Sequence, residues 1–439
     1  MVMSLVVFIV FVITLRIVLC SKMDLPSKRI LTLFVLYWYF SLFFSTFSLY
    51  DFYKPSITTL LFLILSITFF LIGFMFPKYS RSNNFTVFSI KNSVDSILES
   101  RIFILSLVLL TIYLIYLFNK FLTVILLDNL TSVRNAYFST GEDNMYGPFF
   151  MQINYYLLKP SCFFISPIFA YSLLFKRSWK TILLLLYLAM NASLGGGRLD
   201  YFRYLIIPLV LIYFCFYLQD FKLRPKFLLK ICIIFTCLFT LLSFIGAGRQ
   251  GNMELNQEAF KEGASMTLEQ LTTYSYGPIV AFDYAVNHDY IDKNGGLKYG
   301  KLTLSSFNEI IYYACRILGI NYKNTLYDLV DLKQEAIISI AKSGLGEWWN
   351  ALYTWNLFFY LDFGFLGVIF IPFFIGLIFR KTIIWLYKYR NFYSFAIVYI
   401  MFLIMILSVL DFNFTSMPMA ILLMFLIYKS HNYKICFRV

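Results

Sequence analysis

The chain has 439 residues, of which 60% are hydrophobic and only 14% are charged. Average soluble domains are about half apolar and about a quarter charged, so this composition excludes an ordinary soluble protein. Apolar runs long enough to cross a hydrocarbon layer about 30 Å thick recur along the sequence. The runs are continuous rather than alternating, which argues against a β-barrel and predicts a polytopic helical membrane protein.

The net charge of +14 does not indicate a nucleic-acid partner, because the basic residues stand in small groups beside the apolar runs. The seven cysteines are scattered singly and predict free thiols rather than a disulfide framework. The sequence has no DxD pair, HExxH helix, Walker loop or GxSxG turn. We therefore expect neither a cofactor nor a metal site.

We expect residues 1–439 to form a single integral membrane domain of the all-α class, with about 11 transmembrane helices. In chain order the predicted spans are 2–19, 30–49, 56–76, 102–118, 154–175, 181–196, 201–218, 227–247, 357–379, 393–410 and 414–428. The first has no positively charged n-region and no small-residue cleavage site. We interpret it as a retained span rather than a signal peptide.

Basic residues are concentrated in alternate loops between these spans. One set of loops contains Lys22, Lys28, Arg29, Lys78, Arg81, Lys91, Arg101, Lys176, Arg177, Lys180, Lys222, Arg224, Lys226, Lys230, Arg380, Lys381, Lys388, Arg390, Lys429, Lys434 and Arg438. The positive-inside rule places this side in the cytoplasm, with the N-terminus outside and the C-terminus inside. The segment 248–356 then forms a large extracytoplasmic loop, and a loop of that length is usually functional or separately structured.

Three arginines on successive spans lie at one predicted level. Arg198, Arg203 and Arg249 are each separated from a cytoplasmic basic residue by roughly 27 Å of helix, which places them at the outer edge of the hydrocarbon. A charge at that depth is costly unless it is paired or faces water. Glycines in GGGR (195–198) and GAGRQG (246–251) allow the backbone to approach a ligand closely. Exposed backbone amides beside a guanidinium group form a binding site for an anion, and phosphate fits it best. The glycines assigned to this predicted site for an anionic lipid headgroup are Gly197, Gly248 and Gly251.

Structural roles stay open for several of these residues. Arg198 can pair with Asp200, and Arg203 can extend to the interface as an anchor. Trp348 and Trp349 lie shortly before the ninth predicted span. There they form either part of an interfacial aromatic belt or a platform on which a sugar ring stacks.

Five segments between about residues 130 and 380 carry a family resemblance. They are SVRNAY (132–137), GGGRLDYFRYLIIPLVLIYF with its Gly-Arg turn before an apolar span, GRQG at the end of the next span, YSYGPIVAFD (274–283) and NALYTWNLFFYLDFGFLG (350–367). In their order and spacing, and in the single long outer loop, the chain resembles the Wzy-type O-antigen and capsule repeat-unit polymerases.

The resemblance implies a membrane glycosyltransferase on the outer face of the bacterial cytoplasmic (inner) membrane. Such enzymes transfer a growing glycan from its polyprenyl-diphosphate carrier to the non-reducing end of a lipid-linked repeat unit, without a metal. The implied partners are a polyprenyl-diphosphate-linked oligosaccharide and membrane lipid, and the resemblance leaves room for a chain-length regulator and a flippase.

The same resemblance suggests roles for individual residues. Arg198 and Arg249 would stabilise the departing diphosphate, with Arg134 and Arg203 assisting. Tyr276 lies in a matched segment and is assigned to substrate binding.

The acceptor hydroxyl needs a base or an orienting acceptor, and three residues on the predicted outer side qualify. They are His288, Asp283 and Asp362. Each also has a structural explanation: Asp362 as the N-cap of the ninth span, Asp283 as a partner within the loop, and His288 as a solvated side chain. The sequence does not choose among the three.

Other functions stay open at this point. An O-antigen ligase would use the same donor with a different acceptor. A lipid-linked oligosaccharide flippase or transporter would place charges near the bilayer midplane, whereas the interiors of these spans are nearly free of charge. A sensor or scaffold is the remaining alternative.

Overall fold

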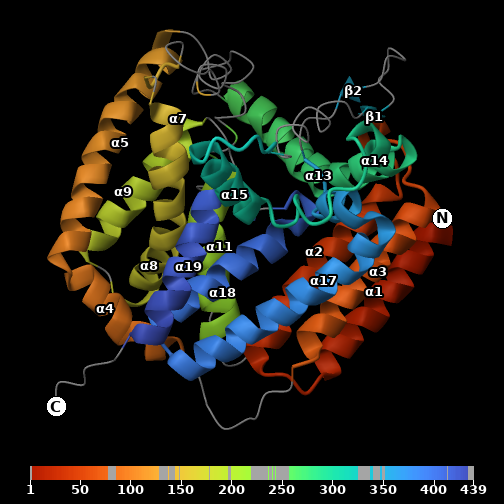
Figure 1. Ribbon diagram of the computed structural model, residues 1–439, viewed down its shortest axis with the longest axis horizontal. Coiled ribbons are helices and arrows are strands. Elements are labelled where there is room, and N and C mark those ends of the chain that lie inside the picture. The colour runs from red at the N-terminus through yellow and green to blue at the C-terminus, as the bar shows by residue number, and fades with distance from the viewer. Residues whose placement is uncertain are drawn as a thin grey trace. The chain divides into compact units, whose positions relative to one another are not determined.

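The computed structural model describes residues 2–77, 86–127, 137, 144–147, 149–176, 178–195, 199–218, 236, 240, 243, 257–324, 337–339, 347–348, 352–412 and 414–433. This part of the chain is almost wholly helical (Figure 1). A short antiparallel pair of strands, β1 (Ile337–Ser339) and β2 (Glu347–Trp348), is the exception among these residues. Contacts divide the chain into two compact units: unit 1 is 1–85 with 272–432, and unit 2 is 86–271 with 433–439.

Seven helices within the described residues are long and apolar enough to cross a membrane. They cover Met3–Cys20, Ile57–Met75, Arg101–Val124, Phe150–Phe175, Leu199–Tyr217, Asn356–Tyr389 and Phe392–Val409. The helical class and the membrane-embedded character of the protein follow from these helices. The predicted span 181–196 corresponds to a shorter apolar helix, Trp179–Leu194, and most of 227–247 lies outside the described residues.

Unit 1 contains helices from both ends of the sequence. Its helices are α1 (Val2–Cys20), α2 (Leu25–Ser45), η1 (Leu49–Asp51), α3 (Ile57–Met75), the part of α13 (Gln257–Asn287) from residue 272, α14 (Tyr290–Lys293), α15 (Ser305–Ile317), α17 (Asn356–Tyr389), α18 (Phe392–Ile406), η7 (Leu407–Val409) and α19 (Met417–Asn432). Side chains of Asp24, Ser56 and Asn391 accept backbone N–H groups at the starts of α2, α3 and α18, which fixes where those helices begin.

The packing of α3 against α17 is the most extensive helix contact in unit 1 (Figure 1). A Cβ atom at Gly73 would collide with the carbonyl oxygen of Phe373, and one at Gly376 would collide with the carbonyl oxygen of Phe70. The two backbones therefore touch, and only glycine fits at these two positions. Phe62 stacks on Phe365 at a ring-centroid distance of 4.0 Å, and further along Phe69 contacts Phe370 and Phe74 contacts Phe379, so the part of α17 after residue 364 runs parallel to α3.

The next helix, α18, is the most enclosed of the membrane-length helices. In its most apolar window, 89% of the residues are buried, compared with 22% for α1. Exposed side chains of α1 such as Leu5, Phe8 and Ile13 are apolar, and a water-facing helix would not present such a surface. We interpret α1 as a helix whose outer face contacts lipid.

A kink divides α17 near its start. Phe363 and Gly364 leave helical geometry, and Gly364 has a φ of +60°, a conformation that favours glycine. After the kink α17 continues to Tyr389, ten residues beyond the predicted span end of 379. The helix extends because RKTIIWLYKY keeps apolar residues at helical spacing beyond the hydrocarbon.

Unit 2 contains the elements between residues 86 and 218 and the part of α13 before residue 272. The elements between 86 and 218 are η2 (Val87–Ile90), α4 (Lys91–Glu99), α5 (Arg101–Leu127), α7 (Phe150–Ile153), η4 (Asn154–Leu158), α8 (Lys159–Phe175), α9 (Trp179–Leu194), α10 (Leu199–Tyr201), η5 (Phe202–Ile206), α11 (Ile207–Leu209) and η6 (Val210–Tyr217). Helix α9 packs against both α5 and α8. The helix α5 runs well past the predicted end at residue 118, because NKFLTVILL continues its apolar face.

Two helices of unit 2 contain π-helical turns directly before a proline. The π-helix η4 precedes Pro160, and the π-helix η5 precedes Pro208. Proline lacks an N–H and its ring collides with the carbonyl four residues earlier, so a locally wider turn relieves the clash. These spans therefore stay continuous despite their prolines.

The close approach of α3 and α17 gives the first prediction. In an ordinary helix Gly→Ala stabilises by about 0.5–1 kcal/mol, but Gly376→Ala should destabilise the protein by about 1–3 kcal/mol because the new methyl group overlaps a backbone carbonyl. Thermal unfolding of the purified protein in detergent measures the effect. Ile378→Ala, on the exposed face of the same helix, is the control and should change the melting temperature less. A Gly376→Ala protein more stable than the wild type would contradict the packing.

Candidate functional site

One end of unit 1 gathers the three predicted candidates for a base. The part of α17 after residue 364 runs parallel to α3, so that part and α3 begin at this end, whereas Asn356, the first residue of α17, bonds Ser66 in the middle of α3. Asp283 bonds the residue before α3, Asp362 lies directly before the kink of α17, and His288 lies between α13 and α14. The helix α14 packs against α17. The structure thus brings together residues that are far apart in sequence.

Asp283 holds α13 to the start of α3. One carboxylate oxygen accepts the backbone N–H of Ser56 at 2.9 Å and its hydroxyl at 2.6 Å. The other oxygen accepts the side-chain amide of Asn287 at 3.1 Å. Asp283 is only 8% exposed, so its contacts are those of a positioned structural group.

Asp362 holds the turn 298–303 against α17. Its carboxylate accepts the backbone N–H of Leu302 at 3.1 Å and that of Thr303 at 2.6 Å. Two main-chain bonds reinforce the turn, because Lys298 donates to the carbonyl of Leu361 and Tyr299 donates to the carbonyl of Asp362. Asp362 is fully buried. It does not cap the ninth span, because α17 begins at Asn356 and the carboxylate instead accepts from the turn.

His288 is the exposed member of the three. Its ring stacks on Tyr284 with 3.7 Å between ring centroids, and its Nδ1 lies 2.9 Å from the carbonyl oxygen of the same residue. A carbonyl only accepts, so Nδ1 carries the proton in the neutral ring and Nε2 is left as the acceptor. This geometry gives His288 an oriented nitrogen that is able to take a proton.

The remaining described candidates lie in different surroundings. Tyr276 is buried, with its ring 5.4 Å from that of Phe52 in unit 1. In unit 2, Arg203 forms an ion pair with Asp200 at 3.1 Å, so the acid that we considered as a partner for Arg198 bonds Arg203. Trp348 belongs to the strand β2.

The predicted diphosphate site lies outside the described residues. This applies to Arg134, Arg198, Arg249, Gly197, Gly248, Gly251 and Trp349. Their assignment stays a prediction. In the part of the chain that the structure describes, no group of three or more His, Cys, Asp or Glu side chains is arranged to hold a metal ion.

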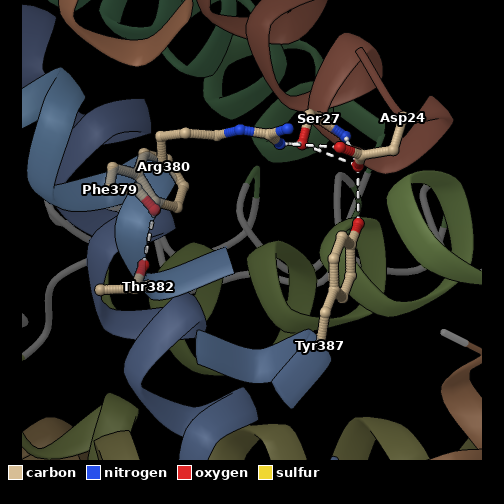
Figure 2. Close-up of polar contacts among 6 residues, drawn as sticks. All are labelled: Asp24, Ser27, Phe379, Arg380, Thr382 and Tyr387. Carbon is tan, nitrogen blue, oxygen red and sulfur yellow. Dashed lines mark hydrogen bonds and ion pairs between the residues drawn. The ribbon is translucent and has the colours of Figure 1, made fainter. Parts of the chain in front are cut away.

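Sequence reasoning missed a polar cluster at the opposite end of unit 1 (Figure 2). Arg380 Nη1 lies 2.7 Å from Asp24 Oδ1, and the two residues are 356 positions apart. The other carboxylate oxygen accepts the hydroxyl of Tyr387 at 2.6 Å and that of Ser27 at 2.8 Å. Arg380 also donates to Ser27. The only signal in the sequence is one acid in a loop that otherwise carries basic residues.

The cluster sets the ionisation of Asp24, which lies between α1 and α2. Burial alone would raise the pKa of this carboxyl. The nearby guanidinium of Arg380 and the hydrogen bonds from Tyr387, Arg380 and Ser27 outweigh burial and lower the pKa below its ordinary value. Asp24 is therefore a carboxylate at neutral pH, and it holds α2 to the far end of α17.

No protein-family model, curated protein or solved structure matches this chain.

The ion pair gives the second prediction. Asp24→Asn should lower the free energy of unfolding at pH 7 by about 3 kcal/mol, because Arg380 is only 3% exposed and loses its countercharge. A carboxyl whose folded pKa is lowered stabilises above its unfolded pKa and loses that contribution as pH falls through the folded value. The difference between wild type and Asp24→Asn should therefore shrink below about pH 4. Thermal unfolding across pH 3–7 tests it, and a pH-independent difference would contradict the ion pair.

The contacts of the three base candidates give the third prediction. Asp283→Asn and Asp362→Asn should each destabilise the protein by about 1–3 kcal/mol, because an amide NH₂ cannot accept the hydrogen bonds that the carboxylates accept. His288→Ala should leave the melting temperature nearly unchanged, since its side chain is exposed. Thermal unfolding of the three variants decides this. Equal losses in all three would mean that His288 is also part of the scaffold.

Proposed function

We propose that the protein is a polysaccharide polymerase of the Wzy type. It transfers a growing glycan from a polyprenyl-diphosphate carrier to the non-reducing end of a lipid-linked repeat unit, on the outer face of the bacterial inner membrane. The observation that carries this proposal is a contact between two of the segments that bear the resemblance. Phe282, in 274–283, packs edge to face on Tyr360, in 350–367, with 6.0 Å between ring centroids.

This contact supports one site rather than two unrelated motifs. Asp283 and Asp362, each next to or near one of the two rings, are occupied by Ser56, Asn287 and the turn 298–303. His288 lies between α13, which carries the first segment, and α14, which packs on the helix that carries the second. Two carboxylates thus build the scaffold, and the histidine remains as the group with an oriented acceptor nitrogen.

The proposed reaction uses these residues and the predicted arginines as follows. The acceptor hydroxyl oxygen attacks C1 of the donor sugar while the bond between C1 and the diphosphate oxygen breaks. The electron pair of that bond leaves with the diphosphate, and the hydroxyl proton passes to Nε2 of His288. Arg249 and Arg198 balance the charge of the leaving group, a role that paired guanidinium groups fill without a metal.

The proposed topology has eleven spans with the N-terminus outside, the segment 248–356 outside and the C-terminus in the cytoplasm. The two ends of unit 1 are consistent with it. Arg380 and the loop with Asp24 lie at one end, where basic residues are concentrated, and His288 lies at the other. The basic end is the cytoplasmic end under the positive-inside rule.

The polysaccharide made by a strain without this protein tests the function. A polymerase mutant carries one repeat unit on its acceptor and shows no ladder on a gel. A ligase mutant carries no repeat unit, and a flippase mutant accumulates lipid-linked repeats on the cytoplasmic face. Either of the last two results would overturn the proposal in favour of the corresponding function. A ladder like that of the wild type would exclude the polymerase, the ligase and the flippase functions.

Arg249 gives the fourth prediction, made in the same strain complemented with variants. Arg249→Ala should reduce elongation by a factor of about 100 to 1,000, because a charge contact to the leaving group is lost. Arg249→Lys should recover little, since an ammonium keeps the charge but loses the bidentate fork. Ladders are compared at equal amounts of inserted protein, with Lys429→Ala as the control, a basic residue that is placed on the cytoplasmic side. Full activity of Arg249→Ala would shift the diphosphate site towards Arg198 and Arg134.

A further inference from the structure

The helix α15 has its polar and apolar faces reversed relative to a helix on a soluble protein. Its inward face carries Ser305, Ser306, Asn308 and Glu309, all buried. Its outward face carries Phe307 and Ile311, which are 37% and 50% exposed, and the flanking Leu304 and Leu318 are 55% and 73% exposed. We call Leu304, Phe307, Ile311 and Leu318 the α15 stripe; their spacing of three, four and seven places them on one face.

The polar face of α15 is fixed to the start of α19. Glu309 accepts the backbone N–H of Met417, the first residue of α19, at 2.7 Å. Asn308 accepts the hydroxyl of Tyr322, and the rings of Phe307 and Phe414 lie 6.0 Å apart. A rotation that buried the α15 stripe would pull Glu309 away from the N–H group that it satisfies. The stripe is therefore held outward by the hydrogen bonds behind it.

The surface next to the stripe indicates what covers it. Helix α19, on which α15 packs, exposes an apolar row of its own. The row consists of Ile421, Met424, Phe425 and Tyr428. Because α19 packs on the membrane-length helix α18, we assign this row to lipid contact. The stripe lies at the start of α19, where the exposed surface also includes Arg316 and Lys323. Apolar side chains bordered by basic ones are typical of a helix in the membrane interface.

We propose that α15 is an interfacial helix whose stripe inserts into the bilayer, with Arg316 at the level of the lipid phosphates. Full burial of a side chain as large as leucine gains about 1.5–3 kcal/mol, so transfer of the exposed parts of these four side chains into lipid favours insertion. The insertion does not depend on the proposed catalytic activity. Only the assignment to the outer leaflet depends on the proposed orientation.

This insertion has a consequence for the candidate site. Leu302 and Thr303 donate to Asp362, and Leu304, the next residue, begins the α15 stripe. The turn that Asp362 holds is therefore continuous with the lipid contact. Through this turn α15 fixes the height of the candidate site relative to the bilayer surface, which a membrane-anchored substrate requires.

Site-directed fluorescence tests the insertion, as the fifth prediction. The seven cysteines are replaced, and single cysteines are placed at Ile311, at Leu318 and at Asp292, an exposed position outside the stripe. Each is labelled with bimane in vesicles of phosphatidylethanolamine and phosphatidylglycerol. Brominated acyl chains should quench the labels at 311 and 318 several-fold more strongly than the label at 292, whereas aqueous iodide should show the opposite order.

Two other results would overturn the proposal. Quenching by iodide at 311 and 318 equal to that at 292 would place the stripe in water. Protection of 311 and 318 from both quenchers would show that protein covers it, either another segment of this chain or a second copy. An impermeant thiol reagent applied to spheroplasts separately reports the side of Asp292→Cys. Labelling only after lysis would move α15 to the inner leaflet and leave the insertion intact.

Discussion

The contact of α3 with α17 is the constraint on which the rest of unit 1 depends. Gly73 and Gly376 let two backbones touch, so dispersion forces, aligned ring pairs and one buried hydrogen bond, from Ser66 to Asn356, hold these helices. Because α3 and the part of α17 after residue 364 run parallel, the first turns of both lie at one end of unit 1 and their last turns at the other. The candidate site and the Asp24 cluster are the two results of that alignment.

Acidic residues at both ends of unit 1 hold segments of the chain together through hydrogen bonds and an ion pair. Asp24 joins α2 to the far part of α17, Asp283 joins α13 to α3, and Asp362 joins a turn to the near part of α17. Each carboxylate accepts hydrogen bonds from protein donors in place of water. These bonds offset the free-energy cost of burying the charge. His288 differs because it is exposed and makes its contacts locally, with the ring and the carbonyl oxygen of Tyr284.

The helix α15 is amphipathic, but its polar face is buried against the protein and its apolar face is exposed. In a soluble protein the two faces have the opposite orientation. On its inward face, Glu309 accepts the backbone N–H of Met417 and Asn308 accepts the hydroxyl of Tyr322. The apolar residues of the α15 stripe point outward. In water that arrangement would lose the hydrophobic contribution of every exposed side chain. Beside a bilayer the same side chains are removed from water and contribute hydrophobic free energy. The direction of the apolar face therefore indicates that this side of α15 faces lipid.

Hydropathy alone determined the helical membrane class, because the apolar length of a run is a local sum over neighbouring residues. The family resemblance, not hydropathy, singled out the segments 274–283 and 350–367, and only the structure gave the contact between Phe282 and Tyr360. Helix ends were harder to place: α5 and α17 continue past the predicted span ends, because apolar residues at helical spacing follow the charged or polar residues where the spans were ended. Only the tertiary structure decided that Arg380, one of many basic loop residues by sequence, pairs with Asp24, and that Asp362 caps a turn instead of a helix. Those choices depend on which helices become neighbours, and Gly73 and Gly376 set that neighbourhood for α3 and α17 through backbone contact.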